Sequence, residues 1–141
     1  MANSYHAEII NLSQNDTSIF KSFNVIDVRK RFLGIVKIYK ITISKNDIQE
    51  AINIVQSNMS RKIKKEWYAT FHNSEKAIVV FRKKLFKLST TGINPVYQHK
   101  LDTTNSVDKK HWDEMISYAK SLNIPDNQLD FLPPDFRTEK Y

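Results

Sequence analysis

Short stretches of alternating apolar and polar residues dominate the first two thirds of the chain, and such alternation is typical of half-buried β-strands. The clearest stretch covers residues 35–43, where both faces carry apolar residues, so a central strand is predicted there. Further strands are predicted at residues 5–12, 24–31, 67–72 and 77–81, and a short edge strand opened by proline at residues 95–101. The strand at residues 77–81 either continues to Leu88 or bends at the three charges of residues 82–84.

Two other segments repeat apolar residues every three or four positions, which indicates amphipathic helices. The first starts after the capping residue Ser44 and carries an apolar stripe of Ile48, Ala51, Ile52, Val55 and Met59. The second covers residues 108–122, with a stripe of Trp112, Met115, Ile116, Ala119 and Leu122. Asn123 and Pro125 end it.

The order of these elements from residue 35 onward is close to the split β-α-β, or ferredoxin-like, pattern, with a weak closing strand at residues 128–132. We expect one α+β domain over residues 1–141, with an antiparallel sheet of about five strands and both helices packed on one face. Only the last four or five residues are expected to be disordered. The expected core comprises Ile38, Ile41, Ile52, Val55, Val79, Phe81, Trp112, Ile116 and Ala119.

The composition excludes several classes of site and protein. The chain has no cysteine, which removes disulfides and thiolate metal sites. Its two glycines are too few for a phosphate-binding glycine loop. No segment has the length of a membrane span, and the first residues lack the pattern of a secretion signal. We therefore expect a cytoplasmic protein without a membrane partner.

The charge of the chain is +7, and it is distributed unevenly. Residues 17–101 contain 17 bases and 5 acids, whereas residues 102–141 contain 5 bases and 8 acids. Such a basic body favours an anionic partner. A second interpretation is codon composition, because 17 of the 22 bases are Lys and because Ile and Asn are abundant, as in AT-rich genomes. This bias favours a low-GC bacterium or one of its mobile elements as the source.

Ten of these bases form three short clusters close to predicted strand or helix ends. Phosphate contacts by such bases supply most non-specific nucleic-acid affinity, and neighbouring aromatic residues suit single strands. Since lysine predominates, we expect weak binding with little sequence preference. The alternative is a solvated surface with its aromatic residues in the core. The clusters are Arg29, Lys30 and Arg31; Arg61, Lys62, Lys64 and Lys65; and Arg82, Lys83 and Lys84; the aromatic residues are Phe32, Trp67, Tyr68, Phe81 and Phe86.

Motifs of known catalytic or recognition modules are absent from the chain. Residues 76–81 lack the glycines and the aromatic pair of an RNA-recognition strand. The four histidines have no metal-ligand spacing, and no serine-nucleophile motif occurs. We therefore expect a non-catalytic interaction protein without metal or cofactor, forming a homodimer through exposed strand edges and binding nucleic acid or an acidic protein. The alternative is a small enzyme or ligand-binding protein with a site near His72 and His99.

Overall fold

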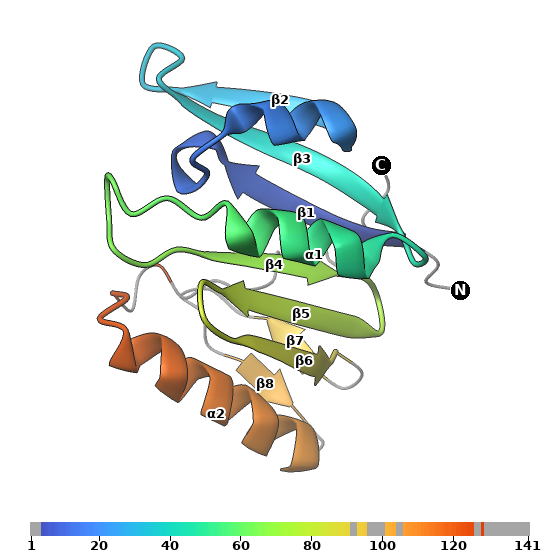
Figure 1. Ribbon diagram of the computed structural model, residues 1–141. Coiled ribbons are helices and arrows are strands. Elements are labelled where there is room, and N and C mark those ends of the chain that lie inside the picture. The colour runs from blue at the N-terminus through green and yellow to red at the C-terminus, as the bar shows by residue number, and fades with distance from the viewer. Residues whose placement is uncertain (1–3, 91–92, 96–100, 104–105, 126–127, 129–141) are drawn as a thin grey trace.

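An antiparallel sheet of six strands forms the centre of the protein (Figure 1). The computed structural model describes residues 4–90, 93–95, 101–103, 106–125 and 128. The strands of this sheet lie in the order β2-β3-β1-β4-β5-β6, and β7 and β8 form a separate two-stranded sheet. The strands are β1 (Ser4–Ile10), β2 (Asn24–Arg31), β3 (Val36–Ser44), β4 (Tyr68–His72), β5 (Lys76–Phe81), β6 (Leu85–Ser89), β7 (Ile93–Pro95) and β8 (Leu101–Thr103).

Two α-helices and two 3-10 helices complete the described fold. They are α1 (Ile48–Ser57), α2 (Ser106–Ser121), η1 (Asn11–Ser13) and η2 (Thr17–Ser22). The Asp16 side chain caps η2 by accepting a hydrogen bond from the Ser18 amide at 2.9 Å. Before α1, Ser44 Oγ donates to the Asp47 carboxylate at 2.8 Å, which fixes the turn out of β3. Among the described residues, no helix is long and apolar enough to cross a membrane.

The α+β class and the antiparallel sheet are confirmed, but the sheet has six strands where about five were expected. The chain bends at residues 82–84, so the second half of the predicted long strand becomes β6. β1 is antiparallel to both β3 and β4 and lies between them, so α1 connects two parallel strands across it. The ferredoxin-like arrangement is not confirmed, and of its expected closing strand at residues 128–132 only Gln128 lies within the described residues.

The two α-helices cover opposite faces of the sheet, so the prediction that both pack on one face is wrong. Alternate residues of β5 show this directly. Ile78 and Val80 pack in the core under α1, whereas Val79 and Phe81 pack in a second core with α2. Since residues 77–81 are all buried, this strand needs apolar cover on both sides. The apolar sequence of residues 77–81 does not indicate which helix covers which face of the sheet.

The expected core is accordingly divided between two clusters. Ile41, Ile52 and Val55 belong to the cluster under α1, and Val79, Phe81, Trp112 and Ala119 to the cluster with α2. Ile38 and Ile116 are only half-buried. The strand expected at residues 95–101 also differs, because Pro95 and Leu101 pair with each other as the ends of β7 and β8. Residues 96–100 and 129–141 lie outside the described part of the chain.

Candidate anion-binding site

The strand pairing brings all three basic clusters to the same end of the sheet. β2 ends at Arg31 opposite Val36, and β1 ends at Ile10 opposite Ile38, so these strands finish on one side. β4 is antiparallel to β1 and therefore begins on that side. Its first residue, Tyr68, lies opposite Phe81, the last residue of β5. The clusters after β2, before β4 and after β5 thus project from one end, on the left in Figure 1.

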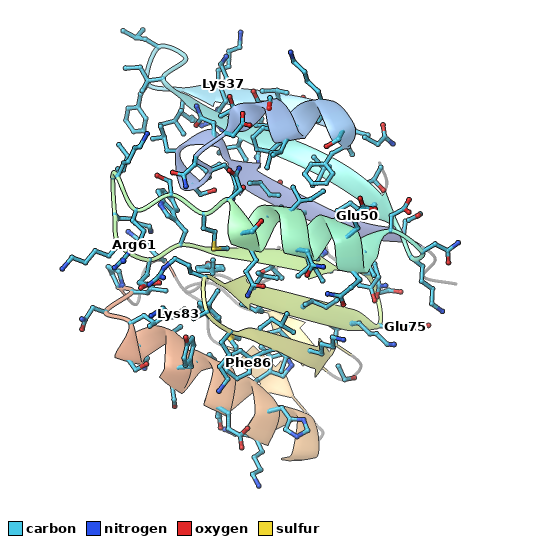
Figure 2. The ribbon with its side chains drawn as sticks, in the orientation of Figure 1. Lys37, Glu50, Arg61, Glu75, Lys83 and Phe86 are labelled. Carbon is cyan, nitrogen blue, oxygen red and sulfur yellow. The ribbon has the colours of Figure 1, made fainter. Side chains whose placement is uncertain are left out.

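The charge of this end differs sharply from that of the opposite end. We define the basic end as residues 29–37, 61–66 and 82–84, which contain eleven bases and one acid. At the opposite end, the connections at residues 44–47 and 73–76 each contain one base and one acid. Figure 2 shows Arg61 and Lys83 at the basic end and Glu50 and Glu75 at the other. Among the described residues, positive charge is therefore concentrated in the three basic connections at one end of the sheet.

The first cluster lies at the end of the β2–β3 hairpin. Arg29 forms an ion pair with Glu8 of β1 at 2.8 Å between Nη2 and Oε1, and both side chains are about two-fifths exposed. Arg31 lies on the same face as Arg29 by strand alternation, and Lys30 lies on the other. All three are exposed, so this cluster offers positive charge to both sides of the hairpin.

The second and third clusters lie beside each other before β4 and after β5. The Arg82 guanidinium reaches Glu66 at 3.2 Å, and this partly buried ion pair joins the two connections. The ammonium of Lys64 lies 4.3 Å from the centre of the Trp67 ring and donates to Gln128 Oε1 at 2.7 Å. Partial burial lowers the pKa of Lys64. Lys84 stacks over Phe86 and Tyr118 at 5.0 and 5.2 Å.

Six of the ten predicted bases have no ion-pair or cation-π partner among the residues that the structure describes. They are all exposed, so their charged groups are available to an external anion. The six are Lys30, Arg31, Arg61, Lys62, Lys65 and Lys83. Arg29, Lys64, Arg82 and Lys84 instead support the hairpin and the two connections through the contacts given above.

The aromatic residues beside these bases are mostly core residues, against the expectation of a stacking surface. Phe81 is buried, and Tyr68 and Phe86 pack against the core with α2. Trp67 is half-buried under Lys64. Phe32 alone of the five is largely exposed, at 77% of its surface. A surface with several free aromatic faces is therefore not present in this part of the chain.

The sequence interpretation missed a set of exposed aliphatic residues among the bases. Leu33 and Ile35 at the β2–β3 turn are 105% and 67% exposed, and Ile63 in the second cluster is 66% exposed. The signal was present in the chain, because Ile63 lies directly between two bases, and because Leu33 and Ile35 belong to a short apolar run between Arg31 and Lys37. The sequence alone does not indicate its exposure, because the short apolar run after Arg31 is also consistent with a turn and with the start of the following strand.

A second missed feature is a pair of histidines on the face of the sheet opposite α1. His6 of β1 and His72 of β4 are directly opposite in the register, and their ring centres are 6.2 Å apart. Burial, with a smaller effect of the nearby Lys40 ammonium, lowers the pKa of His6. Spacing along the chain cannot reveal such a pair, which only strand pairing creates. His99, the expected partner of His72, lies outside the described residues.

A groove of about 620 Å³ lies between α1 and the β5–β6 hairpin, away from the basic end. Apolar residues form its floor, including Ile48, Ile52 and Ile78, while Lys76 and Lys87 line its rim. None of the ten predicted bases lines this groove, and neither does His72.

Groups of three or more side chains that could hold a metal ion are absent from the described part of the chain. No protein-family model, curated protein or solved structure matches this chain. The geometry of the basic end is therefore the main indication of what the protein binds.

Proposed function

We propose that the protein is a non-catalytic interaction protein that binds phosphodiester polyanions with the basic end of its sheet. The observation that carries this proposal is the contrast between the two ends: eleven bases and one acid at one, and balanced charge at the other. Weak nucleic-acid binding, the function expected from the sequence, is one form of this activity. Phospholipid headgroups present the same phosphodiester chemistry.

The chemistry of the free bases sets the character of this binding. Four of the six exposed bases without an ion-pair or cation-π partner among the described residues are lysines, which act as point charges and read no base pattern. Each phosphate that they neutralise releases a counterion, so affinity falls steeply as salt rises. We therefore propose binding that is weak, salt-dependent and insensitive to sequence. The six strands span roughly 24 Å at about 4.8 Å per strand, so an extended polyanion can contact several clusters at once.

A second candidate, a ligand-binding protein or small enzyme, is favoured by the groove between α1 and β5–β6. Its size is in the range of small-molecule sites, and its apolar floor suits an apolar ligand. The His6–His72 pair is the other feature in its favour. We rank this candidate second because none of the described histidines lines the groove, and because the histidine pair lies on the opposite face of the sheet from α1.

The test compares two variants of equal net charge. Lys62→Gln/Lys65→Gln removes two charges from the basic end, and Lys45→Gln/Lys76→Gln removes two from the opposite end. Binding of a labelled oligonucleotide, single-stranded and duplex, is measured by anisotropy over a range of salt concentrations. The first variant should weaken binding to every sequence and reduce the salt slope by about two, whereas the control keeps wild-type affinity. Equal losses in both variants, or no binding of any polyanion at low salt, would refute the proposal.

A further inference from the structure

The turn between β2 and β3 presents large apolar side chains on a backbone that disfavours them. Phe32 and Leu33 have φ angles of 52° and 58°, followed by Gly34 at 86°. Positive φ brings Cβ against the following carbonyl, so residues other than Gly, Asn and Asp rarely adopt it. Turn positions with positive φ ordinarily carry Gly, Asn or Asp. A bulky pair that is strained and also exposed gains nothing for the fold, and such conflicts between sequence and backbone mark functional positions.

The turn is nevertheless held in a defined geometry at its base. The Gly34 amide donates to the Arg31 carbonyl at 3.1 Å, and the Ile35 amide donates to the Phe32 carbonyl at 3.2 Å. Asn11, at the end of β1, extends the ladder: its Nδ2 donates to the Ile35 carbonyl, and its Oδ1 accepts from the Lys37 amide at 3.0 Å. The apolar tip therefore projects from a hydrogen-bonded support.

A second apolar residue in a basic setting occurs at the same end of the sheet. Ile63 is exposed and lies between Arg61 and Lys62 on one side and Lys64 and Lys65 on the other. The hairpin tip has the same pattern, since Phe32, Leu33 and Ile35 lie between residues 29–31 and Lys37. Figure 1 shows both connections projecting from the left end of the sheet. Apolar side chains surrounded by bases are the composition of surfaces that insert shallowly into anionic bilayers.

We infer that the basic end docks on the surface of an anionic phospholipid bilayer, with Phe32 and Leu33 entering the headgroup–acyl boundary and the surrounding bases contacting headgroup phosphates. This inference rests on the proposed function and names its partner. Bilayer is favoured over nucleic acid because three of the four exposed apolar residues of this end are aliphatic and have no ring to stack on a base. The earlier expectation of no membrane partner depended on the absence of a spanning segment, and surface docking requires none.

The test uses the full chain and extruded vesicles of phosphatidylcholine, alone or with about one third phosphatidylglycerol. Sedimentation with vesicles measures the affinity of the wild type and of Phe32→Ser/Leu33→Ser, which keeps every charge. Ile26→Ser, a change of an exposed apolar residue of β2 away from the tip, is the matched control. Oligonucleotide anisotropy is measured for the same proteins. Far-UV circular dichroism checks that each variant is folded.

The wild type should bind the anionic vesicles and not the neutral ones. The tip variant should bind them about tenfold more weakly while its oligonucleotide affinity stays within about twofold, and Ile26→Ser should match the wild type. Phe32→Trp should add an emission component that shifts to the blue on binding and is quenched by brominated acyl chains.

Three results would overturn the inference. Oligonucleotide binding without binding to anionic vesicles would refute the bilayer partner and leave the proposed function standing. Vesicle binding that the tip variant retains would refute insertion. A wild type that binds neither polyanion would refute both the inference and the proposed function.

Discussion

Truncation of Trp112 tests the assignment of α2 to the face of the sheet opposite α1. Its ring is 1% exposed in the core with β5 and β6, and its Nε1 donates to the Ser89 carbonyl at 2.9 Å. Removal of a buried tryptophan ring costs about 3–5 kcal/mol through lost transfer energy and the cavity left behind. This cost includes about 1 kcal/mol for the lost hydrogen bond. We therefore expect Trp112→Ala to lower the free energy of unfolding by about 4 kcal/mol and Tm by about 12 °C.

The assay is urea unfolding followed by far-UV circular dichroism, because the variant removes one of the two fluorescent tryptophans. His111→Ala, at the exposed neighbouring position on α2, should change stability by less than about 0.5 kcal/mol. Trp112→Phe keeps most of the ring and loses the indole donor, so its loss should be intermediate. If Trp112→Ala costs less than about 1 kcal/mol, α2 does not cover this face of the sheet and the division into two cores is wrong.

Four further predictions concern strain, charge, pH and self-association. Leu33→Asn should raise the free energy of unfolding in urea by up to about 1 kcal/mol, because Asn tolerates the positive φ of this position. Ile35→Asn, at a position without positive φ, should not raise it, and equal effects of the two changes would argue against backbone strain at Leu33. Glu66→Ala removes the ion-pair partner of the partly buried Arg82 and should lower the free energy of unfolding by about 1–2 kcal/mol. As a control, Asp113→Ala, which breaks the exposed pair with Lys109, should lower it by less than about 0.5 kcal/mol. Because folding lowers the pKa of His6 from its usual 6.5, the unfolded chain binds the proton more readily than the folded protein as the pH falls. The free energy of unfolding should therefore be highest above pH 6.5 and should decrease as the pH falls from 6.5 to the pKa of His6 in the folded protein. Urea midpoints measured between about pH 8 and 5 should show this decrease, and His6→Gln should reduce it. Light scattering should detect a homodimer at high protein concentration, with pairing through the edge strand β2 or β6, and a monomer at every concentration would exclude it.

Periodicity predicted well those elements of this fold that bury one or both faces. The alternation of Tyr5, Ala7 and Ile9 marked β1, and the stripe of Ile48, Ile52 and Val55 marked α1. Periodicity does not specify which layer covers which face, and here it failed. The five buried residues 77–81 are equally compatible with two helices on one side and with one on each. Only the split of β5 between two cores distinguishes these arrangements.

The candidate site was predicted in part, and the successes and failures have separate causes. Lysine and arginine clusters are visible in any chain, and their placement near strand ends follows from the element boundaries. The His6–His72 pair depends on the register between β1 and β4, strands separated by more than fifty residues, so no local pattern contains it. The exposed Phe32 and Leu33 were visible but ambiguous, because an apolar pair beside a strand is ordinarily buried.

A codon-composition effect would explain the abundance of lysine and isoleucine but not their positions. A bias toward AT-rich codons acts on every surface position alike, so it would add lysines to both ends of the sheet. The end with residues 44–47 and 73–76 instead has balanced charge. Four of the six large apolar residues exposed in the described chain also lie at the basic end: Phe32, Leu33, Ile35 and Ile63. Surface charge raises the solubility of a protein and exposed apolar side chains lower it, yet here both occur in the same connections. Their coincidence is what a surface must have if it attracts an anionic bilayer over a distance and then holds it by contact.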